Sequence, residues 1–123
     1  MKIEHIFILT LPHRKDRLDN LTKQLDSFGL EYEVFYGIDG KKIKTNYPCD
    51  NLNNGCTAGH GQILQRAKIM GFEKILVLED DCELCIDFNE RIHNLELDDF
   101  DVFYLSGSHK EKPQKINEYY SKC

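Results

Sequence analysis

Long apolar runs are absent from this 123-residue sequence. The longest, residues 6–9 and 75–78, contain four residues each, whereas a membrane-spanning helix needs about 20. The first run is also too short for the apolar core of a signal peptide, and no small-residue cleavage site follows it. The five cysteines are odd in number and lack the spacing of a disulfide framework, which favours a reducing compartment. We therefore expect no transmembrane segment and a cytoplasmic location, unless the chain is cut from a longer precursor.

Positive charge is also scarce. The sequence has 16 Lys and Arg residues against 21 Asp and Glu residues, a net charge of -5, whereas nucleic-acid-binding modules usually carry a basic patch. Only four of the basic residues are Arg, so the planar guanidinium group can recognise an anion at only a few positions. We expect no nucleic-acid partner.

The composition that remains is that of one folded domain. Apolar residues make up 41% of the chain, and it contains seven Phe and six Tyr. This is enough to bury a core and excludes a disordered chain. No repeat, low-complexity segment or linker interrupts the sequence. We predict a single domain over residues 1–123, with a polar tail from about residue 108.

Hydrophobic periodicity predicts strands that alternate with helices. The expected strands are residues 2–11, 32–36, 74–78 and 101–105, and the expected helices are residues 14–28, 57–70 and 87–95. Gly29 and Gly71 should end the first two helices, Thr57 should cap the second, and residues 41–54 should form a loop. The second helix should bury one face, made of Ile63, Leu64, Ala67 and Met70. This order predicts an α/β fold with a mostly parallel sheet flanked by helices.

In such sheets, ligands bind outside the carboxyl ends of the strands. The segment Glu79-Asp80-Asp81 follows the third predicted strand. Three adjacent carboxylates repel one another unless solvent or a cation offsets their charge, and their oxygens suit Mg²⁺ or Mn²⁺. The alternative is a solvated acidic turn that caps the next helix.

A second polar segment, residues 55–61, contains three glycines at the predicted start of the second helix. Free N–H groups and the helix dipole favour an anion at such a position. His60 is then placed to contact a phosphate or a metal. The alternative is a tight turn in which His60 only satisfies local hydrogen bonds.

A third segment, residues 10–17, leaves the first strand and enters a helix, and it contains Arg14 and Arg17. Arginine is well suited to phosphate recognition, although a charged first helical turn is often only solvated.

The pair Cys82-x-x-Cys85 suggests either a redox site or zinc held together with Cys56 and His60. A single C-x-x-C is weak support for either, since structural zinc sites usually contain two such pairs of ligands. We therefore expect the two cysteines to be small apolar core residues, and we expect no tightly bound zinc.

Four blocks, in their order along the chain, resemble glycosyltransferase family 25, the family of bacterial lipooligosaccharide and collagen galactosyltransferases. They are residues 10–18, residues 37–40 (Gly-Ile-Asp-Gly), residues 55–60 (Gly-Cys-Thr-Ala-Gly-His) and residues 75–81, followed by Asp87-Phe88. The resemblance runs from about residue 6 to residue 105. It implies a GT-A-like, Rossmann-like fold that is truncated here, because the family's catalytic domain is about twice as long.

The resemblance also implies a UDP-sugar donor, with galactose as a candidate sugar, and a glycan or protein acceptor, as in lipopolysaccharide biosynthesis. It assigns Mn²⁺ or Mg²⁺ to Asp81 and Glu79 and leaves the catalytic base unidentified. The implied donor-binding residues are Thr10, Leu11, Pro12, Arg14, Arg17, Asp39, Gly40, Gly55, Cys56, His60, Glu79 and Asp80. The alternative is a truncated, inactive module that binds a nucleotide sugar or a protein. A partner chain or homo-oligomer is open in both cases.

Overall fold

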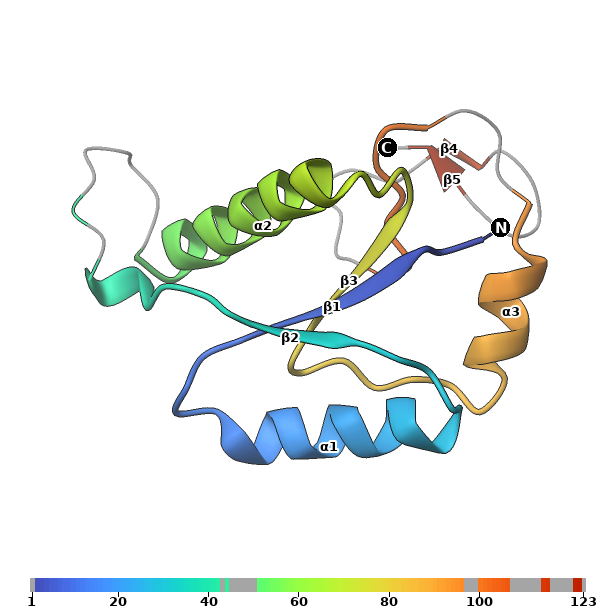
Figure 1. The fold of residues 1–123 in the computed structure, drawn as a ribbon, viewed down its shortest axis with the longest axis horizontal. Coiled ribbons are helices and arrows are strands. Elements are labelled where there is room, and N and C mark those ends of the chain that lie inside the picture. Colours follow the sequence, from blue (N-terminus) through green and yellow to red (C-terminus); the bar gives the residue numbers. More distant parts are fainter. Residues whose placement is uncertain are drawn as a thin grey trace.

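The computed structural model describes residues 2–42, 44, 51–96, 100–106, 114–115 and 121–122. Its centre is a parallel sheet of three strands in the order β2-β1-β3. These strands are β1 (His5–Thr10), β2 (Glu33–Tyr36) and β3 (Ile75–Glu79). Figure 1 shows helix α2 (Asn51–Met70) on one side of the sheet, and α1 (Lys15–Ser27) and α3 (Phe88–Asn94) on the other. The predicted α/β fold with a parallel sheet is therefore confirmed.

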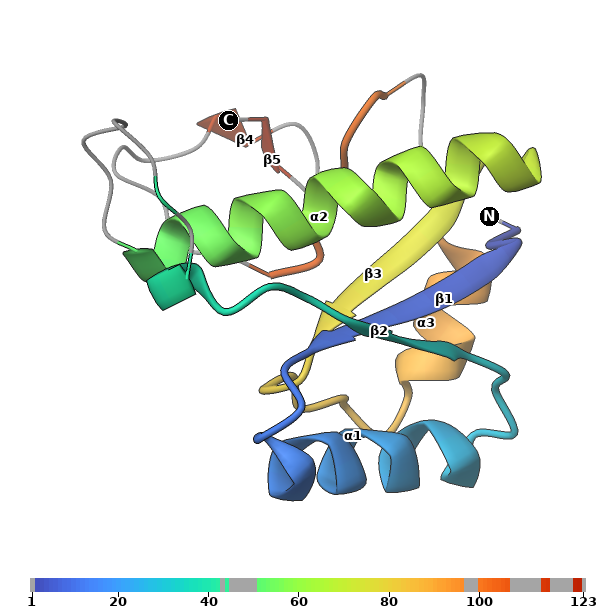
Figure 2. The same cartoon turned by 60° about the vertical axis from the view of Figure 1, so that its left-hand side comes forward.

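The strand register brings the carboxyl ends of the three strands together. Thr10 pairs with Tyr36, the last residue of β2, and Leu9 pairs with Glu79, the last residue of β3. Residues that follow these strands therefore emerge at one edge of the sheet, which we call the carboxyl edge. The view in Figure 2 shows that α2 passes over this sheet while α1 lies beneath it.

The core consists of two apolar layers because side chains alternate along each strand. Ile6 and Ile8 pack with Leu21 and Leu25 of α1 in the layer that also contains Phe88 and Ile92 of α3. Phe7 and Leu9 point to the other face and pack with Ile63 and Ala67 of α2. Burying each of these large side chains contributes roughly 1.5–3 kcal/mol, so both faces of β1 hold the helices in place.

Two predicted helix ends are confirmed. Gly29 and Gly71 follow α1 and α2 with φ angles of 67° and 79°. Glycine adopts this left-handed conformation without the steric cost that a Cβ brings.

The start of the second helix was predicted wrongly, and of its predicted buried face only Ile63 and Ala67 are buried. Helix α2 begins at Asn51, so Thr57 lies inside it rather than at its cap. The predicted loop 41–54 thus contains the first turn of α2 and the end of a short 3₁₀ helix, η1 (Gly40–Lys42). Its residues 43 and 45–50 lie outside the described part. Leu64 and Met70 are 59% and 46% exposed, because residues 63 and 67, one turn apart, are the ones that face β1 and β3.

The predicted fourth strand was also wrong. Residues 101–105 have no strand pairing, and Val102 and Tyr104 are 66% and 71% exposed. An apolar alternation forms a strand only where a neighbouring strand can take its hydrogen bonds. The tail instead contains β4 (Gln114–Lys115) and β5 (Ser121–Lys122), an antiparallel pair that the sequence analysis missed.

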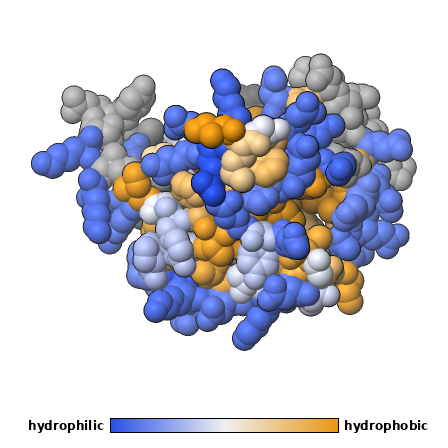
Figure 3. Space-filling view, viewed as in Figure 1, coloured by the Kyte–Doolittle hydropathy of each residue, from blue (hydrophilic) through white to orange (hydrophobic). Residues whose placement is uncertain are grey.

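Hydrophilic side chains cover much of the face shown in Figure 3, and apolar groups are visible between them. None of the helices among the described residues combines the length and the apolar character that crossing a bilayer requires.

Candidate functional site

Two groups of polar side chains meet at the carboxyl edge. The first, the Asp80 cluster, contains Thr10 from the end of β1, Arg14 and Arg17 from the start of α1, and Asp80. The second, the Glu79 cluster, contains Cys56 and His60 from α2 and Glu79. The clusters are joined through the peptide bond between Glu79 and Asp80, so β1, α1, α2 and β3 together supply one site.

Asp80 is the buried anchor of its cluster, with only 2% of its surface exposed. The Thr10 hydroxyl donates a hydrogen bond of 2.7 Å to Asp80 Oδ2. The Nη1 atoms of Arg14 and Arg17 lie 3.5 Å and 3.8 Å from Asp80 Oδ1. A buried carboxylate needs such partners because desolvation of its charge is costly. The acidic segment is therefore not simply a solvated turn, since its middle residue holds two arginines at the carboxyl edge.

These arginines keep part of their surface for other ligands. Their side chains are 34% and 55% exposed for Arg14 and Arg17, and their distances to Asp80 are longer than a good hydrogen bond. Their remaining N–H groups can therefore bind an anion while Asp80 positions them.

In the Glu79 cluster, one carboxylate oxygen has two partners. The Cys56 thiol donates to Glu79 Oε1 over 3.2 Å, and His60 Nε2 lies 3.1 Å from the same atom. Cys56 and His60 are four residues apart and so share one face of α2. Glu79 reaches this face because it is the last residue of β3.

The contacts of the Glu79 cluster change the acidity of its members. Burial raises the pKa of the Cys56 thiol, and the hydrogen bond and charge of Glu79 raise it further, to about 11. Partial burial favours a higher pKa for Glu79, but the hydrogen bonds from His60 and Cys56 outweigh it and lower the pKa below its usual value. The carboxylate is therefore ionised and the thiol protonated near neutral pH.

Close backbone contact fixes the position of α2. A Cβ atom on Gly55 would lie 2.7 Å from the Gly40 nitrogen and 2.8 Å from the Ile38 carbonyl oxygen. Gly55 is thus required for α2 to rest on the turn that follows β2. Asp39 stabilises the same turn, because its Oδ1 accepts a hydrogen bond of 3.0 Å from the Lys41 N–H.

The glycine-rich segment does not lie at a helix start, as the predicted anion site requires. Residues 55–61 lie inside α2 rather than at its start, so their N–H groups bond to preceding carbonyls of the helix. The structure does bring Gly40 and Gly55 together, and it places Cys56 and His60 beside Glu79 through their side chains.

A small cavity of about 250 Å³ lies beside the Asp80 cluster. Leu11 and Pro12, both predicted donor-binding residues, line it together with Lys15, Leu18 and Tyr36. Lys15, Leu18 and Tyr36 were not among the predicted site residues. The register could have indicated Tyr36, since it is the residue that ends β2 next to Thr10.

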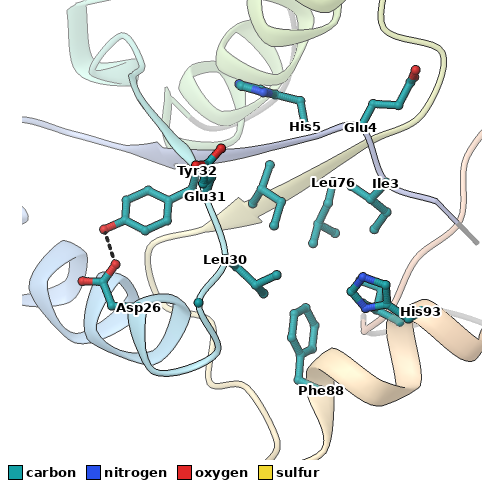
Figure 4. A pocket seen from close by; sticks show the side chains of 13 residues that line it. Ile3, Glu4, His5, Asp26, Leu30, Glu31, Tyr32, Leu76, Phe88 and His93 are labelled. Atoms are coloured by element: carbon teal, nitrogen blue, oxygen red, sulfur yellow. Dashed lines mark hydrogen bonds between the residues drawn. The ribbon is translucent and has the colours of Figure 1, made fainter.

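A second cavity, of about 790 Å³, lies at the opposite edge of the sheet. Figure 4 shows Leu30, Leu76 and Phe88 facing into it, and Tyr32 hydrogen-bonded to Asp26 at its margin. These residues precede or begin the strands, or come from the helices beneath them. This cavity is therefore separate from the two clusters at the carboxyl edge.

The remaining predicted residues take different positions. Asp81, the predicted metal ligand, is exposed. Cys82 is half-buried against the α1 side of the core, but Cys85 is exposed, so only Cys82 fits the predicted core role. Within the described part of the chain, the group of at least three His, Cys, Asp or Glu side chains close enough to share a metal is Cys56, His60 and Glu79.

The chain is thus an α/β protein with a parallel sheet and with arginines and carboxylates at the carboxyl edge, the edge at which open α/β sheets usually bind ligands. A family model described as glycosyltransferase family 25 (LPS biosynthesis protein) matches residues 3–122, and the chain belongs to this family.

The relatives found are distant and much longer. A glycosyltransferase 25 family member of Aedes aegypti is 26% identical over 118 residues, which cover 80% of this chain and 19% of the relative. Procollagen galactosyltransferase 2 of Mus musculus is 25% identical over 142 residues, which cover 94% of this chain and 23% of the relative. The human protein of that name is also 25% identical, over 85% of this chain and 20% of the relative. The chain thus spans about a fifth of the length of these relatives. No solved structure gives a significant match.

Proposed function

We propose that this glycosyltransferase family 25 chain binds a UDP-sugar at the carboxyl edge through Mn²⁺ or Mg²⁺ and serves the transfer of the sugar to an acceptor. The observation that carries the proposal is the meeting of the Asp80 and Glu79 clusters at the ends of β1 and β3. It places cationic and anionic groups side by side, as a metal-bound diphosphate requires.

The roles follow from exposure and charge. Asp80 is buried and already paired, so it positions Arg14 and Arg17 to receive phosphate oxygens. Asp81 is exposed, and the Glu79 side chain is 48% exposed, so their oxygens are accessible to a hard cation. The residues present therefore fit the metal, which when bound would offset the negative charge of the departing diphosphate.

The nucleoside would occupy the 250 Å³ cavity beside the arginines. Leu11 and Pro12 provide an apolar wall, and Tyr36, 56% exposed, provides an aromatic surface. Thr10 supports this wall from within by its bond to Asp80. Asp39, Gly40 and Gly55 contribute by fixing the turn against α2 rather than by a side chain directed at the donor.

The candidate sugar and acceptors come from the names of the relatives. Procollagen galactosyltransferases point to galactose and a protein acceptor, and the description of the family as LPS biosynthesis proteins points to a glycan acceptor. A protein acceptor and a glycan acceptor both fit the proposed donor site.

The test is a thermal-unfolding titration with UDP, with and without Mn²⁺. A ligand at 100 times its dissociation constant stabilises the fold by about 2.7 kcal/mol, so UDP should raise the melting temperature only when the metal is present. Asp81→Asn should abolish this metal dependence, while Asp19→Asn, an exposed change on α1, should leave it intact. Equal stabilisation by UDP in the presence of a chelator would refute the metal-dependent site.

A second candidate is a module that binds the nucleotide sugar without turnover. The observation in its favour is that the chain covers only 19% to 23% of its relatives. Both candidates predict UDP binding. They differ in whether a sugar acceptor stimulates UDP release from a UDP-sugar.

A further inference from the structure

We propose that Cys56, His60 and Glu79 form a binding site for a divalent metal of the zinc class, separate in ligand chemistry from the Mn²⁺ or Mg²⁺ position assigned to Asp81. The site needs no nucleotide. It revises the expectation of no tightly bound zinc, which was based on the single Cys82-x-x-Cys85 pair and on the assignment of Cys56 and His60 to the donor site.

The geometry is close to that of a three-ligand tetrahedral centre. The sulfur of Cys56, a ring nitrogen of His60 and a carboxylate oxygen of Glu79 all lie within 4.8 Å of one another. Zinc binds such atoms at about 2.0–2.3 Å, so two tetrahedral ligands lie about 3.3–3.7 Å apart. The observed separations of 3.2 Å and 3.1 Å from Glu79 Oε1 require only small side-chain movements to admit the ion.

The backbone holds the three ligands in place before the metal arrives. Cys56 and His60 lie one turn apart on α2. Gly55 allows this helix to pack closely against the turn at Gly40. Glu79 ends β3, a strand paired with the central strand. A preformed ligand set reduces the loss of side-chain entropy on binding.

The donor set selects the metal. One thiolate sulfur, one imidazole nitrogen and one carboxylate oxygen suit zinc and its neighbours better than the hard ions Mg²⁺ and Mn²⁺, which prefer oxygen ligands. On binding, the Cys56 thiol loses its proton to the buffer, and His60 binds as the neutral ring. The metal then takes the place of the two hydrogen bonds that now converge on one oxygen of Glu79. Three protein ligands leave a fourth position for water or another donor.

The experiment uses Co²⁺ as a coloured substitute for Zn²⁺, added to the reduced, chelator-treated chain without nucleotide. One equivalent should produce a near-ultraviolet sulfur-to-cobalt charge-transfer band and visible bands of tetrahedral Co²⁺, and added Zn²⁺ should bleach both. Cys56→Ser should remove the charge-transfer band. His60→Ala should weaken Co²⁺ binding by more than about 100-fold, because loss of even an outer-shell partner costs roughly 10–100-fold.

The matched control keeps Cys56 and replaces the other four cysteines, 49, 82, 85 and 123, with serine; it should retain the band. If this variant fails to fold, the double variant Cys82→Ser/Cys85→Ser takes its place. Absence of the band in the wild-type chain, or its survival in a folded Cys56→Ser variant, would overturn the proposal.

The two metal proposals can fail independently. Asp81→Asn should preserve the Co²⁺–thiolate band while it abolishes the Mn²⁺ dependence of UDP binding. Glu79 belongs to both proposals, so its variants are not used to separate them. If Co²⁺ gives the band but UDP does not bind, the metal site stands and the proposed donor site falls.

Discussion

At the scale of single residues, the carboxyl edge depends on two neighbouring carboxylates that differ in burial and in their partners. Asp80 is 2% exposed and satisfied by Thr10, Arg14 and Arg17. Glu79 is half-exposed and faces α2. Successive residues at a strand end point in opposite directions, so one carboxylate is structural and the other is accessible to ligands.

Thr10→Val should destabilise the fold, because it keeps the shape of the side chain but leaves Asp80 Oδ2 without its hydrogen-bond donor. A buried polar group that loses its partner costs about 1–3 kcal/mol. Thr22→Val is the matched control. It removes exposed hydrogen bonds to the Asp19 carbonyl and the Tyr32 side chain and should change the stability by less than about 0.5 kcal/mol. Urea unfolding measures both, and equal effects would show that the bond to Asp80 contributes little.

The Cys56 thiol should react slowly with iodoacetamide when no metal is present. Its pKa of about 11, against an ordinary value of 9.0, leaves about a hundredfold less of the reactive thiolate at pH 8. The rate should keep rising with pH up to about 11, since deprotonation continues over that range. Site-resolved mass spectrometry measures this rate.

Glu79→Gln provides the control for that experiment. It removes the negative charge that raises the pKa of Cys56 and should therefore speed the alkylation at pH 8. A rate that is unchanged by Glu79→Gln, or already maximal at pH 8, would contradict the assigned cause.

At the scale of elements, the contact between α2 and the turn after β2 positions the Glu79 cluster. Gly55 is buried in this contact, whereas Gly61, six residues further along α2, is exposed with nothing within 4 Å of an added Cβ. The same substitution at these two helical glycines should therefore have opposite effects.

Gly61→Ala should stabilise the fold by about 0.5–1 kcal/mol, because alanine has the higher helix propensity. Gly55→Ala should destabilise it by about 1–3 kcal/mol, because the new methyl group would overlap backbone atoms of Ile38 and Gly40 and overpacking of this kind displaces the helix. Thermal unfolding with circular dichroism checks the signs. Stabilisation by both substitutions would show that α2 does not rest on this turn.

At the scale of the whole molecule, the 123 residues contain the proposed donor site and match about a fifth of the length of their relatives. General-base help is worth roughly 10²–10⁴ in rate, and positioning of the acceptor contributes more. We expect the acceptor site of a family member to draw on residues outside the matched region.

Residues 1–123 by themselves should therefore bind UDP but transfer sugar slowly. The measurement is UDP release from UDP-galactose and other UDP-sugars, with and without simple sugar acceptors, with Asp81→Asn as the control for metal-dependent hydrolysis. Acceptor-stimulated release by this chain alone would show that the acceptor site lies within it.

The sequence by itself determined the alternation of strands and helices, since short apolar runs and helical spacing are local patterns. It also indicated that residues 10–17 and 79–81 would meet, because both follow parallel strands. Gly29 and Gly71 marked helix ends for a local reason, their left-handed backbone.

Tertiary structure alone decided the rest. Helix α2 continues through residues 51–56 because Gly55 permits contact with a turn fifteen residues earlier, at Gly40, which no helix signal in the sequence reveals. Residues 101–105 form no strand, because strand formation depends on a neighbouring strand rather than on alternation. The different roles of Glu79 and Asp80 could not be predicted from the sequence either, because the two adjacent residues carry the same charge. The fold alone buries Asp80 beside Thr10 and turns Glu79 toward Cys56 and His60.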